Sequence, residues 1–196
     1  MPIDKSIDYS AITPEIKALT KLCLADNVIE PEMYVKYAVN RGLRDLNGNG
    51  VLTGLTEISE IQSSKMVDGE KVPCEGKLFY RGVDVEQIVS GFIREKRYGF
   101  EETVYLLLFG ALPDEAQLDD FKKLLAGYRS LPTNFVRDVI LKAPNADMMN
   151  TLARSVLTLY SYDARATDNS TENVLRQCLQ LIALFPMLSG YGYQAY

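Results

Sequence analysis

The 196-residue sequence contains no histidine and no tryptophan, and only three of its residues are cysteine. Without histidine a chain cannot build an ordinary zinc site, a Ser-His or Cys-His nucleophile pair, or an imidazole that titrates near neutral pH. Cys23, Cys74 and Cys178 are odd in number and widely spaced, which matches neither a disulfide framework nor a CxxC metal site. We therefore expect three reduced thiols and no histidine-dependent catalytic centre.

The sequence also lacks a run of basic residues and a long hydrophobic stretch. Its 26 acidic and 21 basic residues are scattered and give a net charge of −5, so nucleic acid and anionic membranes are not expected as partners. No window approaches the roughly 18 apolar residues of a membrane span, and the first ten residues do not resemble a signal peptide. Because 47% of the residues are hydrophobic, we expect a globular, cytoplasmic chain with a sizeable core.

Helical periodicity and helix start signals dominate the sequence. Asn169 and Glu172 have the spacing of a capping box at the start of the last helix. That helix has no stop signal, which is typical of an interrupted element. The predicted helices run from Pro14 to about residue 25, from Pro31 to Ala38, from Asp84 to beyond Phe92, from Glu101 to Gly110, from Pro113 to Tyr128, from Asn134 to Lys142, from Asp147 to Tyr160, and from Thr171 towards the C-terminus.

A strand-like pattern is confined to residues 54–81. Residues 54–59 suggest a short strand, and two further short strands flank Asp68-Gly69, a dipeptide suited to the positive φ angles of a tight hairpin turn. Residues 77–81 complete the pattern. The sequence therefore predicts a mostly α fold with a small antiparallel sheet of two or three strands.

One loop has a partial calcium-binding pattern. Asp45, Asn47 and Asn49, followed by Gly50, match the first six positions of an EF-hand loop. Position twelve is Thr56, so the bidentate carboxylate that completes such a site is missing, and the next residues suggest a strand where an EF-hand has a helix. A polar Gly/Asn loop is the favoured interpretation, with calcium binding as the alternative.

Three segments together resemble the N-terminal part of citrate synthases. They are Gly-Leu-Thr-Glu-Ile-Ser at 54–59, Gly-Lys-Leu-Phe-Tyr-Arg-Gly-Val-Asp-Val-Glu at 76–86, and Phe-Glu-Glu-Thr-Val-Tyr-Leu-Leu-Leu-Phe-Gly-Ala-Leu-Pro at 100–113. Residues 147–160 and 174–196 resemble the two long helices that follow in that family. The resemblance covers about three quarters of the chain and leaves the first forty or so residues outside.

The resemblance implies a domain organisation and an activity. Residues 1–42 would be an N-terminal helical extension, and residues 43–196 the N-terminal half of the large, multi-helical citrate synthase domain, truncated. The family condenses acetyl-CoA with oxaloacetate, using one histidine and an aspartate to form the enol and a second histidine to polarise the keto acid. Because the motifs that carry these groups are absent, we expect no catalytic, cofactor-binding or metal-binding residue here, and a fragment that is inactive alone. Acetyl-CoA would be a co-substrate of the complete enzyme, and 2-methylcitrate synthases share the same motifs.

The family's two long helices lie at a twofold dimer interface, so the resemblance also implies a homodimer. The candidate contacts with a second copy are Ala153, Val156, Leu157, Tyr160, Leu179, Ile182 and Leu188. The alternative is that these side chains pack within one chain. A second hypothesis for the whole chain is a stand-alone helical dimerisation or interaction module without catalysis.

Overall fold

The structure, a computed structural model, describes residues 8–40, 42–44 and 51–196. Within them it has mainly helices and a three-stranded antiparallel sheet, which confirms the predicted fold class.

The chain forms two compact units: unit 1 comprises Met1–Thr20 and Asp119–Tyr196, and unit 2 comprises Lys21–Leu118. The predicted extension over residues 1–42 is thus divided between the units, and its separate role stays a prediction. The calcium-type pattern at Asp45, Asn47 and Asn49 lies outside the described residues.

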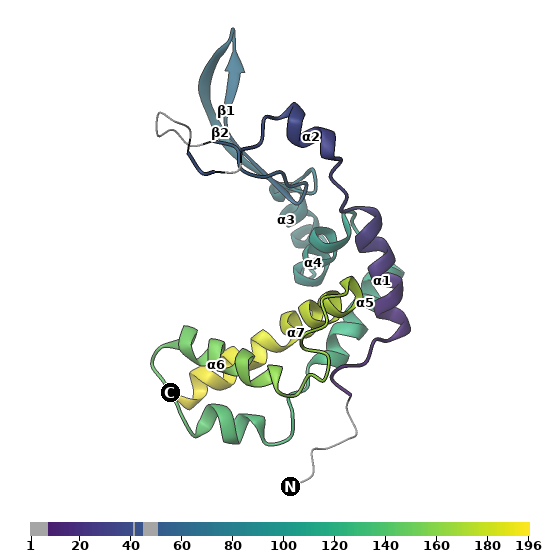
Figure 1. Ribbon diagram of the computed structural model, residues 1–196, viewed down its shortest axis with the longest axis vertical. Helices are drawn as coiled ribbons and strands as arrows, with labels where there is room; N and C mark the ends of the chain where they lie inside the picture. Colours follow the sequence, from purple (N-terminus) through teal and green to yellow (C-terminus); the bar gives the residue numbers. More distant parts are fainter. Residues whose placement is uncertain (1–7, 41, 45–50) are drawn as a thin grey trace. The chain divides into compact units, whose positions relative to one another are not determined.

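The sheet of unit 2 is built on a long hairpin. Strands β1 (Ser59–Val67) and β2 (Glu70–Tyr80) pair antiparallel, and β3 (Val83–Asp84) adds to β2 in the order β1-β2-β3 (Figure 1). The φ angles of Asp68 and Gly69 are 52° and 84°, so this dipeptide makes the predicted tight turn.

One strand prediction was wrong. The structure has no strand over residues 54–58, and β1 begins at Ser59. The apolar pattern of residues 54–59 is too short to distinguish a strand from an extended connection. The strands on either side of the turn are also longer than predicted. They form a largely exposed two-stranded ribbon, in which residues of β1 pair with residues of β2 through their backbones.

A strained turn connects the sheet to helix α3 (Val85–Arg94). Arg81 and Gly82 have φ angles of 49° and 78°, and the Asp84 carboxylate accepts a hydrogen bond of 2.9 Å from the Glu86 N–H, which caps the helix as predicted. This hydrogen bond, together with Lys77, lowers the pKa of Asp84. The chain therefore enters α3 at a fixed point directly after β3.

The Arg81 side chain ties this turn to the end of helix α4 (Phe100–Phe109). Its guanidinium donates two hydrogen bonds, of 3.2 and 3.1 Å, to the carbonyl of Leu107, and a third to the Asn27 side-chain oxygen. The Asn27 amide donates in turn to the carbonyls of Leu108 and Cys23. Carbonyls in the last turn of a helix have no partner within the helix. These side chains provide the hydrogen-bond donors for the last carbonyls of α4. Arg81 and Asn27 thus have a structural role.

Helix α4 supplies much of the core of unit 2. Tyr105, Leu106 and Phe109 are buried, and the Tyr105 and Phe109 rings meet edge to face with centroids 4.6 Å apart. The other apolar residues of the run from Val104 to Leu108 are half-buried. An apolar run without a polar side predicts burial on all sides, whereas the structure leaves these remaining residues only partly covered.

Gly110 ends α4 in the left-handed conformation, with φ 82°. A Cβ added there would also lie 3.0 Å from the Cβ of Asp26. We expect Gly110→Ala to lower the free energy of unfolding by about 1–2 kcal/mol, the cost of a left-handed backbone for an L-residue. Urea denaturation followed by circular dichroism measures this.

Gly91→Ala is the matched control for Gly110→Ala. Gly91 lies inside α3 with open space around its Cα and without a positive φ, so alanine there is expected to stabilise the protein by about 0.5–1 kcal/mol. If both substitutions changed stability in the same direction, the backbone explanation for Gly110 would be contradicted.

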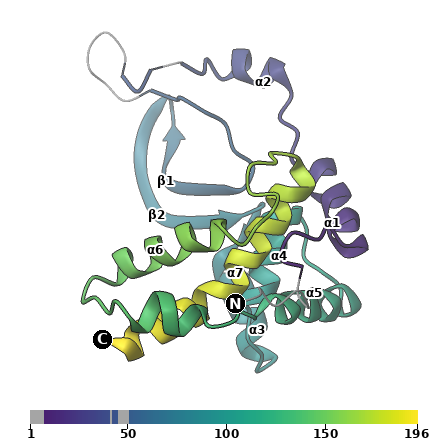
Figure 2. The ribbon, with the colours of Figure 1, turned by 60° about the horizontal axis from the view of Figure 1, so that its bottom comes forward.

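Unit 1 is helical. It includes the end of α5 (Glu115–Tyr128), the short π-helix η1 (Val136–Leu141), α6 (Met148–Tyr160) and α7 (Thr171–Ala195), and Figure 2 shows α6 running beside α7. The helices approach closely where a Cβ on Gly192 would lie 3.0 Å from the Thr151 methyl group. A small core forms from Phe135, Ile140 and Leu188, with partly buried Leu131, Val139, Leu152, Leu159, Tyr162 and Ala195 around it.

The cap of α7 differs from the prediction. Ser170, not Asn169, is the N-cap, and its hydroxyl accepts a hydrogen bond from the Asn173 N–H. Two adjacent residues with capping side chains make the sequence ambiguous by one position. Among the helices of the described residues, none combines the length and the hydrophobicity needed to cross a membrane.

Candidate functional site

A buried arginine organises unit 1. Arg176 on α7 has an exposure of 0%, and its guanidinium pairs with the Asp163 carboxylate at 2.7 Å. It also donates to the Asn173 side-chain oxygen, to the Gln180 side-chain oxygen at 2.8 Å and to the carbonyl of Tyr9. A buried guanidinium is tolerated when its donors are satisfied and its charge is balanced. This arrangement is structural, because its groups are already committed to one another.

Arg176 and its neighbours hold the segment from Asp8 to Ser10, which we call the N-terminal strap, against α7 and the loop before it. The Ser10 hydroxyl donates to Asp163 at 2.9 Å and accepts from the Ala164 N–H at 2.7 Å. The carbonyl of Tyr9 accepts from Gln180 as well as from Arg176. A segment more than 150 residues away in sequence is therefore fixed by hydrogen bonds rather than by apolar packing alone.

Asp163 is the acidic centre of this network. Burial by itself raises its pKa, but hydrogen bonds from four donors outweigh that effect and lower the pKa from 3.8 to about 2. The donors are Arg176, Gln177, the Arg165 backbone N–H and Ser10. Asp163 therefore stays ionised at neutral pH and does not act as a general base.

The depressed pKa predicts a pH dependence of stability. Since the pKa is lower in the folded state, the contribution of Asp163 is complete above pH 3.8 and is lost as the pH falls through about 2. We expect the difference in free energy of unfolding between the native chain and Asp163→Asn to shrink across this window. Urea denaturation at several pH values measures it. A difference that stayed constant from neutral pH to pH 2 would contradict the assignment.

An exposed apolar stripe follows one side of α6. Residues at helical spacing on that side include the predicted contacts Ala153, Val156, Leu157 and Tyr160. Leu157 is 74% exposed, Ala153 and Tyr160 are exposed, and Val156 is half-buried. The opposite side of the helix, with Thr151 and Ser155, is buried. Four of the seven predicted contacts therefore lie together on an accessible surface, which we call the α6 stripe.

The three predicted contacts on α7 divide differently. Leu179 and Leu188 have exposures of 0%, so within this chain they are core residues with no surface to offer a second copy. Ile182 is half-buried. It lies on the same side of α7 as exposed Val174, Cys178 and Phe185. The interface itself stays a prediction, and its accessible part consists of the α6 stripe and the surroundings of Ile182.

Sequence reasoning missed accessible apolar residues of these helices, including three close to the predicted contacts. Met149 belongs to the α6 stripe and is as exposed as Leu157, and Val174 and Phe185 flank Ile182 on α7. Helical spacing from Ala153 and Leu157 could have identified Met149, which lies one turn before Ala153. The α7 residues had no such signal, because apolar residues occur around most of that helix.

The described residues contain no group of three or more His, Cys, Asp or Glu side chains that could hold a metal ion. Within the described part of the chain, all carboxylates with a shifted pKa are shifted downward, through hydrogen bonds from hydroxyl groups, side-chain amides, backbone N–H groups or cationic side chains. They are Glu15, Asp84, Glu95, Asp138, Asp163 and Asp168. A general base near neutral pH needs a shift in the other direction, so these groups remain structural anions.

Comparisons with known proteins supply the family. Residues 45–196 match the family model described as citrate synthase, C-terminal domain. The chain belongs to the citrate synthase family. It is 33% identical over 138 residues to the citrate synthase of Saccharolobus solfataricus, an alignment that covers 70% of this chain and 33% of that protein. It is 30% identical over 141 residues to 2-methylcitrate synthase 1 of Corynebacterium glutamicum, covering 71% and 32%.

A solved structure supports the same family. The crystal structure of citrate synthase from Pyrobaculum aerophilum matches with a TM-score of 0.57 and 28% identity, over 78% of this chain and 38% of that one. The resemblance in the sequence is thereby confirmed. The chain spans about a third of the length of the curated citrate and 2-methylcitrate synthases that it matches.

Proposed function

We propose that this chain forms scaffold and subunit contacts of a citrate synthase-type enzyme and does not itself carry the acid/base groups of the condensation. The observation that carries the proposal is membership of the family in a chain without histidine. The family resemblance implies that enol formation and polarisation of the keto acid depend on histidines. A chain without them cannot make those proton transfers in the same way.

The electrostatics of the described residues support this proposal. Their shifted carboxylates remain ionised at neutral pH, and burial raises the pKa of Tyr105 and Tyr128, which keeps both hydroxyl groups neutral. None of these groups is poised to exchange a proton near neutral pH. These shifted groups therefore do not substitute for the absent histidines.

The reaction that we assign to the enzyme type is condensation of acetyl-CoA with oxaloacetate to citrate and coenzyme A. Relatives named citrate synthase and 2-methylcitrate synthase both match this chain, so the choice of acyl-CoA stays open between them. We propose that this chain alone binds neither acetyl-CoA nor oxaloacetate. Isothermal titration calorimetry with each compound tests this, with no saturable heat expected. Saturable binding of either would contradict the proposal.

We further propose that the chain pairs with a second copy through the α6 stripe. A contiguous set of exposed apolar side chains is costly to leave in water and is typical of a protein interface. Leu157, Met149 and Tyr160 supply the large side chains that such contacts use. In a twofold-symmetric dimer, α6 of one copy can pack against α6 of the second copy, so that the two α6 stripes cover each other.

The same surface supports a second candidate function, a stand-alone dimerisation module that does no chemistry. The exposed α6 stripe favours it, since pairing needs no catalytic group. The reading frame after codon 196 separates the candidates. A continuation that encodes histidine motifs would support the enzyme scaffold, and a stop codon would support the module.

The proposal also places the chain in the cytoplasm. Cys23, Cys74 and Cys178 form no disulfide with one another in the part of the chain that the structure describes, as expected for a reducing compartment. Thiol titration of protein freshly isolated from cells tests this, with three reactive thiols expected after denaturation.

A further inference from the structure

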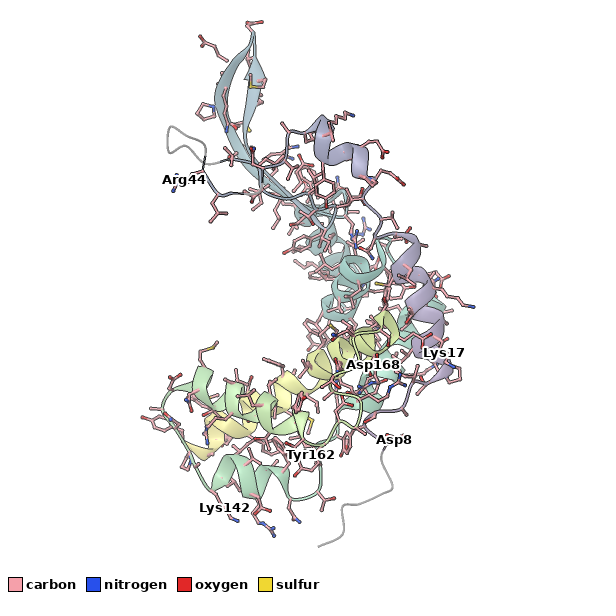
Figure 3. The ribbon with its side chains drawn as sticks, viewed as in Figure 1. Asp8, Lys17, Arg44, Lys142, Tyr162 and Asp168 are labelled. Carbon is pink, nitrogen blue, oxygen red and sulfur yellow. The ribbon has the colours of Figure 1, made fainter. Side chains whose placement is uncertain are left out.

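Unit 1 contains a pocket to which the proposed function assigns no role. Its volume is about 420 Å³, within the range of small-ligand sites. The end of α5, one side of α6, the loop before α7, the first half of α7 and the N-terminal strap enclose it. In Figure 3, Asp8 of the strap and Tyr162 of the loop lie near each other, and both line the pocket.

Aromatic rings and carboxylates characterise the lining. Four tyrosines contribute to the wall: Tyr9, Tyr128, Tyr160 and Tyr162. The charged lining residues are Asp8 and Asp163, with no lysine or arginine among them. Arg176 touches the lining residues Tyr9 and Asp163, but it is fully buried and its charge is balanced by Asp163. The pocket wall therefore contains four tyrosine side chains and has a surplus of negative charge.

Asp8 supplies this surplus. Its Oδ1 accepts a hydrogen bond of 2.9 Å from the Ser10 N–H, and it forms no ion pair with any residue that the structure describes. The strap that carries Asp8 is fixed by the bonds of Tyr9 and Ser10 to Arg176, Gln180 and Asp163. The carboxylate is thus held at the rim before a ligand arrives, which lowers the cost of binding.

We propose that this pocket binds a small organic cation with an apolar body, such as a quaternary ammonium compound. A cation is attracted to the faces of aromatic rings and to a nearby carboxylate. The aliphatic lining residues Val156, Leu159, Leu181 and Leu184 provide contact for the apolar body. An anion, including the phosphates of an acyl-CoA, finds no positive side chain in the lining. The proposal does not depend on the proposed enzyme scaffold, although Val156 and Tyr160 belong both to the pocket lining and to the α6 stripe.

The decisive test compares two probes of the same shape. Phenyltrimethylammonium carries the charge, and tert-butylbenzene replaces the nitrogen by carbon. We expect the cation to bind about tenfold more tightly than the neutral compound, because ring faces and Asp8 act only on the charged form. NMR titration of the 196-residue protein measures both affinities. Equal affinities would show an apolar cavity and overturn the proposal, as would the absence of binding by both probes.

Variants locate the site. Tyr160→Leu and Asp8→Asn are each expected to weaken cation binding by about threefold to tenfold. Asp8→Asn should leave binding of tert-butylbenzene nearly unchanged. Leu157 belongs to the α6 stripe but does not line the pocket, so Leu157→Glu should retain cation affinity. If Tyr160→Leu and Asp8→Asn bound the cation as the native protein does, the probe would occupy another place and the proposal would fail.

Discussion

Replacing Arg176 by methionine is expected to lower the free energy of unfolding by about 3–5 kcal/mol, the typical cost of removing one partner from a buried ion pair. The substitution leaves Asp163 without its cation and removes a donor from the Tyr9 carbonyl and from the Asn173 side chain. Methionine fills a similar volume, so the loss reports on polar groups rather than on a cavity. Urea denaturation followed by circular dichroism measures it.

Arg165→Met is the matched control for Arg176→Met. Arg165 also pairs with an aspartate, Asp168, at 2.6 Å, but both side chains are partly exposed. Water can replace such a partner, so the change in stability should be far smaller. Equal losses from the two substitutions would contradict the account of Arg176 as a buried organising residue.

Leu157→Glu is expected to convert a dimer of this chain into a monomer. Leu157 lies in the middle of the α6 stripe and is 74% exposed within one chain, so a carboxylate there costs little in the monomer. In a symmetric pair it would be buried near its own copy. We expect the dissociation constant to rise by about 30-fold or more, equivalent to about 2 kcal/mol. Sedimentation equilibrium over a wide concentration range measures this constant.

Ile93→Glu on α3 controls for the introduced charge. Ile93 is 65% exposed and lies in unit 2, away from the α6 stripe in sequence. It should leave the association unchanged. A native chain that sediments as a monomer at all concentrations would contradict the proposed pairing outright. A native dimer that resists Leu157→Glu would move the interface to another surface.

Local signals in the sequence predicted local structure well. Asp68-Gly69, Asp84 and Gly110 each act through their own backbone or through the nearest N–H groups, so a few neighbouring residues determine the outcome. Four residues of the α6 stripe were named from the family resemblance, and helical spacing places them on one side of an amphipathic helix. The strand expected at 54–59 failed because a short apolar run does not determine its pairing partner.

Long-range packing could not be predicted in the same way. The burial of Arg176 depends on Tyr9 and Asp163, which are 167 and 13 residues away in sequence, and no pattern in the sequence relates them. On α7, apolar residues occur around most of the helix, so periodicity could not separate buried Leu179 and Leu188 from more accessible Ile182. The pocket combines residues from five segments of the chain and became visible only in the structure.

The central claim is that this member of the citrate synthase family lacks the chemistry of condensation within its own residues. Release of free coenzyme A from acetyl-CoA and oxaloacetate, followed with a thiol reagent, tests it most directly. The citrate synthase of Saccharolobus solfataricus serves as the positive control under the same conditions. We predict that the purified 196-residue chain releases no coenzyme A above the rate without protein. Turnover by the chain that depends on oxaloacetate would contradict the account.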